Sequence, residues 1–162
     1  MTSRWTSWIL STVLSASLAT SALAATPVPS LSVKTTDRQA FKLGAQRGHV
    51  VIINYWATWC GACLEEMPML RKFAASHPGV RLIGLTYENI TADALRQFAA
   101  THHVGYPVAH IDSSNIPHAL KPTWFGMHAL PLTYVLSPQG IFTKRWVGEL
   151  SVSELQKVVV QR

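Results

Sequence analysis

The two cysteines of the chain, Cys60 and Cys63, are the residues whose type and spacing best suit chemistry. They follow an apolar, strand-like run and open a segment with the spacing of a helix. Backbone N–H groups and the dipole at a helix N-terminus stabilise an anion, so we expect Cys60 to react as a thiolate. Cys63 lies one turn deeper, from where it can attack a mixed disulfide between Cys60 and a substrate. This spacing predicts a reversible dithiol/disulfide pair.

Two other interpretations of the pair remain open. A structural zinc site takes four ligands, and without a second cysteine pair it would need two of the seven histidines. The histidines show no ligand spacing on a predicted helix, although His128 lies close enough in sequence to Pro131 to approach the site. A purely structural disulfide across so short a loop would stabilise the chain little. We predict a redox pair without metal or cofactor, with a metal-binding module as the alternative.

The strands and helices predicted around the cysteines indicate an α/β domain. The run His49–Trp56 is typical of a central strand buried on both faces, and Gly61–Ser76 has apolar residues at helical spacing. Strands and helices then alternate, which favours a parallel βαβ core. The other predicted elements are a hairpin at Leu31–Lys34 and Ala40–Leu43, a strand at Val80–Thr86, a helix at Thr91–His103, a strand at Tyr106–Ile111, helical turns within Ser114–Lys121, a hairpin at Leu132–Ser137 and Ile141–Val147, and a helix at Ser151–Val160.

Length and composition fit one folded domain. The chain has 162 residues, of which 48% are hydrophobic and 14% charged, and this excludes wholesale disorder. Its formal charge of +6 comes from basic residues scattered along the sequence, without the basic run or interleaved aromatic pattern of a nucleic-acid face. We therefore expect no nucleic-acid partner.

The N-terminus has the features of a secretory signal peptide. Arg4 supplies the positive charge, Trp8–Leu23 the apolar stretch, and Ala22-Leu23-Ala24 a small-residue cleavage site. An uncleaved anchor is the alternative, although serines and threonines interrupt the apolar run. Either would place the domain in the periplasm or otherwise outside the cytoplasm. We predict a signal peptide at residues 1–24, a linker at 25–30 and a thioredoxin-like domain at 31–162.

The sequence around the cysteines closely resembles the active-site segment of TlpA/ResA-like thioredoxins, in NYWATWCGACLEEMP at Asn54–Pro68. The resemblance extends over about residues 31–160. It implies a three-layer sandwich: a mixed sheet with helices on both faces, an N-terminal β-hairpin and a central βα insertion. The family's members are exported thiol:disulfide oxidoreductases, often reductants, and some act in cytochrome c maturation. The resemblance implies the same activity here, with disulfide donation as the alternative direction. A peroxiredoxin-type peroxidase is disfavoured, because Cys60 lacks the Thr-x-x-Cys context of that class.

The resemblance also implies roles for residues outside the pair. Leu130-Pro131 looks like the family's cis-proline loop, which would present the Leu130 backbone to an extended substrate peptide. An ordinary trans proline is the alternative. Glu88 stands where ResA-like proteins carry a glutamate near the cysteines, so it is a candidate to tune Cys63 or take its proton. A solvated loop glutamate is the alternative for Glu88.

Residues beside the cysteines are expected to support the chemistry. Trp59 should shield the Cys60 sulfur and contact partners, while Gly61 and Ala62 influence the reduction potential. Ala62 replaces the proline often found before the second cysteine. The implied partners are proteins with disulfides or dithiols and a membrane electron donor, and we expect a monomer. The segment His110–His128 fits no family pattern and is a candidate to shape partner choice.

Overall fold

The computed structural model describes residues 29–121 and 129–160, with the side chains of 158–160 excepted. The predicted signal peptide at 1–24 and His128 lie outside the described residues. Within these two ranges, no helix is long and apolar enough to cross a bilayer.

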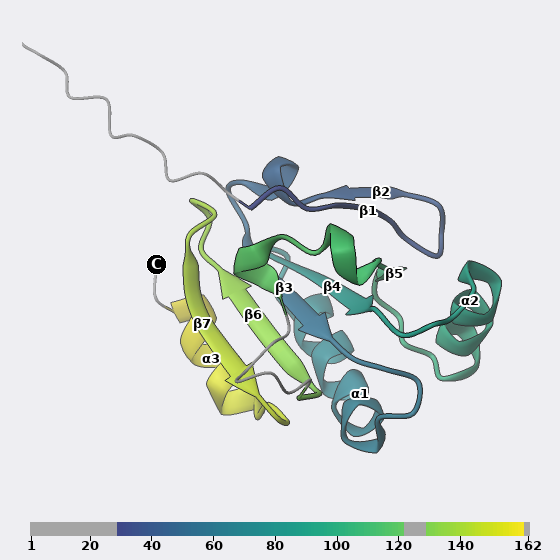
Figure 1. The fold of residues 1–162 in the computed structure, drawn as a ribbon. Helices are drawn as coiled ribbons and strands as arrows, with labels where there is room; N and C mark the ends of the chain where they lie inside the picture. The colour runs from purple at the N-terminus through teal and green to yellow at the C-terminus, as the bar shows by residue number, and fades with distance from the viewer. Residues whose placement is uncertain (1–28, 122–128, 161–162) are drawn as a thin grey trace, which may run out of the picture.

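A five-stranded mixed sheet forms the centre of the domain, with its strands in the order β5-β4-β3-β6-β7 (Figure 1). β3, β4 and β5 run parallel, whereas β6 is antiparallel to both β3 and β7. The carboxyl ends of the parallel strands therefore meet at one edge of the sheet, and β6 begins at that edge. The strands are β3 (Val50–Tyr55), β4 (Val80–Thr86), β5 (Val108–His110), β6 (Leu132–Leu136) and β7 (Phe142–Val147).

The predicted central strand and the helix after it are confirmed. Every residue of β3 is buried, because its valine, isoleucine and aromatic side chains pack on both faces of the sheet. The chain then turns at the carboxyl edge and enters α1 (Gly61–Ser76). The buried side of α1 includes Leu70 and Phe73, which pack against the sheet residues Ile52 and Leu82. Thus the strand and helix that flank the cysteines are both anchored in the core.

The sheet is covered on both faces, as predicted for a three-layer sandwich, although the helices on the second face are only short 3-10 helices. α1 and α3 (Val152–Val160) cover one face, and α2 (Ala92–Thr101) packs beside β5 (Figure 1). The antiparallel hairpin of β1 (Ser32–Lys34) and β2 (Ala40–Lys42) covers the other face. Three short 3-10 helices complete this second layer: η1 (Leu43–Gln46), η2 (Ser113–Asn115) and η3 (His118–Leu120). In the described part of the chain, the core on that face contains no α-helical residue.

Some predicted elements are shorter in the structure. The helix predicted over Thr91–His103 ends at Thr101, because His103 already adopts a left-handed φ of 48°. The strand predicted from Tyr106 begins at Val108, since Pro107 has no N–H to donate to a neighbouring strand. The helical turns predicted within Ser114–Lys121 are the separate 3-10 helices η2 and η3.

Candidate active site

The cysteine pair lies at the carboxyl edge of the sheet, where the loop after β3 enters α1. Cys60 is the N-cap residue of α1, and Cys63 lies in the first turn. The two sulfurs form a disulfide, and the backbone N–H of Cys63 donates to the Sγ of Cys60 at 3.2 Å. The first N–H groups of a helix have no intrahelical partners, and the Cys60 sulfur accepts a hydrogen bond from one of these groups. The predicted placement of the pair is confirmed.

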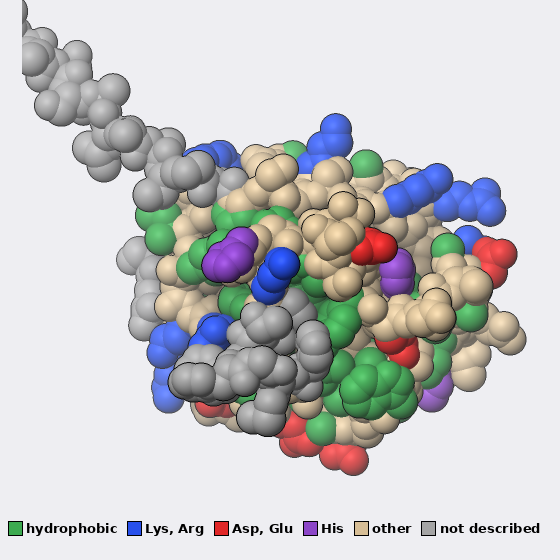
Figure 2. All heavy atoms as spheres, viewed as in Figure 1, with side chains coloured by type: hydrophobic (Ala, Val, Ile, Leu, Met, Phe, Trp, Pro, Cys, Tyr) green, Lys and Arg blue, Asp and Glu red, His purple; other side chains and the backbone are tan. Residues whose placement is uncertain are grey.

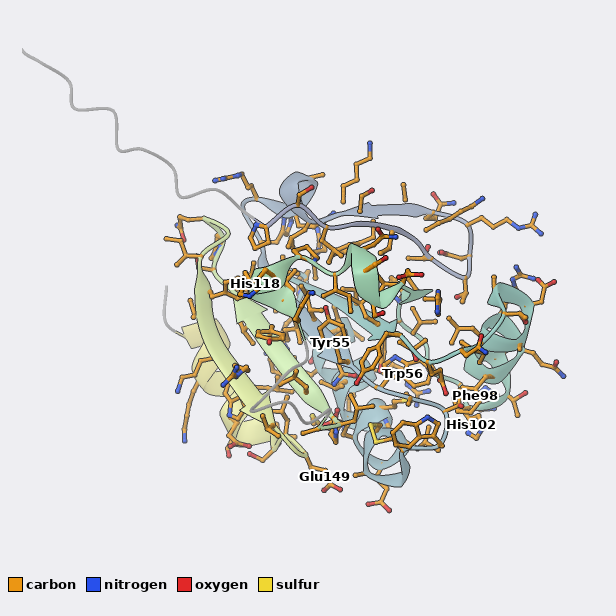
Figure 3. All side chains as sticks on the ribbon, in the orientation of Figure 1. Tyr55, Trp56, Phe98, His102, His118 and Glu149 are labelled. Carbon is orange, nitrogen blue, oxygen red and sulfur yellow. A yellow bond between two sulfur atoms is a disulfide. The ribbon has the colours of Figure 1, made fainter. Side chains whose placement is uncertain are left out.

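The two cysteines differ in their access to solvent. Cys60 is 7% exposed and Cys63 only 1%, so Cys60 is the less buried of the two residues. Trp59 is 72% exposed and stands beside Cys60 as a large apolar surface. Behind the pair, Trp56 is fully buried and its ring stacks on Phe98 at 5.6 Å between centroids (Figure 3). Among the described residues, the site therefore has a buried apolar back and an exposed tryptophan in front.

Pro131 lies at the same edge of the sheet, although it is far from the cysteines in the sequence. The Leu130–Pro131 peptide bond is cis, as the resemblance implied. Because β6 is antiparallel to β3, its first residue Leu132 pairs with Tyr55, the last residue of β3. This register carries Leu130 to the cysteines, where it packs against the buried cluster that contains them. The carbonyl of Pro131 accepts a hydrogen bond from the N–H of Gly148 at 2.8 Å, which ties the loop to the end of β7.

Glu88 is anchored to the loop that precedes the cysteines. Its Oε1 accepts from the N–H of Thr58 at 2.8 Å and from the hydroxyl of Thr86 at 3.1 Å. Its Oε2 accepts from the hydroxyl of Thr58 at 2.9 Å. Among the described residues, no hydrogen bond joins Glu88 to either sulfur. The carboxylate thus holds the backbone two residues before Cys60, and a freely solvated loop glutamate is ruled out.

A buried carboxylate, Glu66, is the polar feature of this region that the sequence interpretation missed. It is 4% exposed, accepts from Nδ2 of Asn54 at 2.7 Å and from the N–H of Leu150 at 3.2 Å. Asn54 also donates to the hydroxyl of Thr133 at 3.0 Å. Burial raises the pKa of Glu66 from 4.5 to about 6, although the hydrogen bonds from Asn54 and Leu150 oppose the rise. The spacing of Glu66 after Cys63 places it on the apolar side of α1, and this spacing could have predicted its burial.

The remaining predicted site residues lie where the sequence placed them. Gly61 and Ala62 form the first turn of α1 between the two cysteines. Within the described ranges, no three His, Cys, Asp or Glu side chains converge in a way that could hold a metal ion. His128 and the residues around it lie outside the described residues, so its approach to the site stays a prediction.

Known thioredoxin-like proteins resemble the chain in sequence and in fold. The Redoxin family profile matches residues 23–159. The thioredoxin-like protein YneN of Bacillus subtilis is 27% identical over 132 residues, which are 80% of this chain and 74% of that protein. The thiol:disulfide interchange protein DsbE of Haemophilus influenzae is 28% identical and covers 81% of this chain and 70% of its own length. A thioredoxin-family thiol:disulfide interchange protein of Chlorobium tepidum superposes with a TM-score of 0.68 at 27% identity, over 83% of this chain and 94% of that one.

Proposed function

Because the chain belongs to the Redoxin family and is a thioredoxin-like thiol:disulfide oxidoreductase, we propose that it reduces disulfides of proteins outside the cytoplasm. The observation that carries the proposal is the Cys60–Cys63 disulfide at the N-terminus of α1, with the less buried cysteine first and the more deeply buried one after it. Such an arrangement suits a nucleophile followed by a resolving thiol.

The proposed reaction proceeds through two exchanges of sulfur atoms. In the reduced protein, the Cys60 thiolate attacks one sulfur of the substrate disulfide, and the other substrate sulfur leaves as a thiolate. The Cys63 thiolate then attacks the Sγ of Cys60, which forms the intramolecular disulfide and releases the second substrate thiolate. The substrate gains two electrons and takes two protons, while the Cys60–Cys63 pair loses them. The N–H of Cys63 that now contacts the Cys60 sulfur would stabilise its thiolate.

The surroundings of the pair support roles in binding and proton transfer. The half-buried Leu130 offers its backbone beside the cysteines, so an extended substrate segment would bind there by strand addition. Trp59 supplies apolar contact area on the other side of Cys60. Glu88 would receive the Cys63 proton, directly or through water, while it holds the Thr58 backbone in place. Gly61 and Ala62 would set the reduction potential through the geometry of the first helical turn.

The proposed function includes export of the protein and exchange of electrons with other proteins. The leader at residues 1–24 would be removed on export and leave residues 25–30 as a linker before the domain at 31–162. A reductant in an oxidising compartment needs a supply of electrons, so a membrane protein would reduce the Cys60–Cys63 disulfide after each cycle. Substrates would be proteins with cysteine pairs, including apocytochromes c, and the protein would act as a monomer.

Two measurements test the proposal. Cys63→Ser should trap substrates as mixed disulfides with Cys60, whereas Cys60→Ser should abolish both turnover and trapping; the two variants are matched because each removes one sulfur from the same turn. Redox titration of the pair should give a potential near about −270 mV, the value of thioredoxin. A potential near about −120 mV would instead make the protein a disulfide donor, and failure of Cys63→Ser to trap any protein would refute the exchange mechanism.

A further inference from the structure

A cationic hollow lies away from the cysteines, between the turn of the β1–β2 hairpin and the start of α2. Its volume is about 300 Å³, and its polar lining consists of Lys34, Thr35, Thr36, Arg38, Arg96 and His110. No carboxylate from the described part of the chain is among its lining residues. Figure 2 shows the blue side chains that gather at this end of the hairpin, above α2. These basic residues are scattered in the sequence, and the fold brings them together.

One of the cations is held in position by the protein itself. The Nε of Arg96 donates to the carbonyl of Thr36 at 3.1 Å, and its Nη1 contacts a carboxylate oxygen of Asp93 at 2.7 Å. A guanidinium carries five N–H donors, so two bonds fix its plane and leave others to face the hollow. The ring of His110 is oriented as well, because its Nε2 donates to the carbonyl of Glu88 at 3.1 Å.

Each nearby acidic residue has a partner within the protein, and one of them, Asp93, is the counter-ion of Arg96. Asp93 pairs with Arg96, Asp37 accepts from the hydroxyl of Thr35, and Asp112 accepts from the N–H and hydroxyl of Ser114. Lys34 and Arg38 pair with no carboxylate of the described residues. Lys34 and Arg38 therefore line the hollow without a counter-ion from the described residues.

We propose that this hollow binds a phosphate group, carried by a small molecule or by a lipid headgroup. Cations converge on it from β1, the hairpin turn and α2, and His110 lines it from β5, so a tetrahedral anion with several oxygens can accept from donors in several directions. Arginine donors favour such oxyanions, and a planar carboxylate would satisfy fewer of them. The volume also suits a small ligand rather than a bare ion. The proposed site goes beyond the thiol chemistry and does not depend on it.

The test is a titration of the oxidised protein with glycerol phosphate at constant ionic strength, followed by backbone amide NMR shifts. We expect saturable shifts at the hairpin turn and at the start of α2. Lys34→Ala should weaken binding at least tenfold, and Arg96→Gln should do the same. Lys42→Ala is the matched control, because Lys42 is exposed on the same hairpin but does not line the hollow; it should change affinity less than twofold.

A second arm distinguishes the source of the phosphate. Vesicles of phosphatidylglycerol are compared with vesicles of phosphatidylcholine, using the same variants. Binding to phosphatidylglycerol that Lys34→Ala abolishes and Lys42→Ala preserves would assign the site to lipid headgroups, whereas saturable binding of glycerol phosphate alone would assign it to small molecules. Equal losses in Lys34→Ala and Lys42→Ala, or no saturable binding in either arm, would overturn the proposal. A double Cys60→Ser, Cys63→Ser variant should bind as the wild type does.

Discussion

Glu66 should make the stability of the domain depend on pH. Its pKa is raised from 4.5 to about 6 in the folded protein, chiefly by burial. The folded state therefore binds more protons than the unfolded chain between these two values, and stability falls as the pH rises through this window. The difference between the pKa values of 4.5 and about 6, at about 1.36 kcal/mol for each pKa unit, lowers the free energy of unfolding by about 2 kcal/mol.

The assay is urea unfolding of the oxidised protein at a series of pH values from about 4 to about 7.5, followed by circular dichroism. Glu66→Gln keeps an oxygen that can accept from Asn54 but removes the titration. The free energy of unfolding of the wild type, minus that of the variant, should fall by about 2 kcal/mol across the series. Other titrating groups are common to both proteins and cancel in this difference.

Glu65→Gln is the matched control, because it removes a charge from the exposed side of the same helix. The Glu65→Gln difference measures what an exposed charge on this helix contributes, and the fall for Glu66→Gln should exceed it. A difference for Glu66→Gln that is constant within about 0.5 kcal/mol, or that rises with pH, would refute the claim that burial of this carboxylate outweighs its hydrogen bonds.

Three further substitutions test the packing and the hydrogen bonds around the site. Gly84→Ala should destabilise the domain by about 1–3 kcal/mol in urea unfolding, because the added Cβ would lie 2.6 Å from Nε1 of the buried Trp56; full stability would show that the indole can move. Thr91→Ala removes the side-chain cap of α2 and should cost about 1 kcal/mol in the same assay, while an unchanged midpoint would mean that the cap contributes nothing. Glu88→Gln should cost about 1–2 kcal/mol, because an amide offers only one oxygen for the Thr58 bonds; equal stability would contradict this anchoring role.

Local patterns were sufficient to predict the elements that carry the cysteines. The uninterrupted apolar run of β3 and the helical spacing of α1 are each encoded within a short segment, so both were predicted nearly to their ends. The position of Leu130-Pro131 beside the pair came from resemblance, because nothing local to that dipeptide reveals that β6 pairs with β3.

Contacts between distant segments could not be predicted in the same way. Glu66 accepts hydrogen bonds from Asn54 on β3 and from Leu150 just before α3, and this requires the packing of α1 on the sheet. Likewise, the anchoring of Glu88 to Thr58 depends on which strand lies next to β3. The basic residues of the hollow looked like a dispersed surface charge, since their convergence depends on how the hairpin folds back toward α2.

The antiparallel direction of β6 has a consequence for the order in which the site is assembled. The two cysteines are synthesised well before Pro131, yet the substrate-binding side of the site exists only after β6 has paired with β3. Pairings between segments far apart in the chain close large loops and form slowly. A newly made chain would therefore pass through an interval in which Cys60 is exposed on an incomplete site, open to any oxidant or thiol. Premature oxidation in that interval would join Cys60 to Cys63, the same bond that the folded protein carries, because the chain contains no other cysteine.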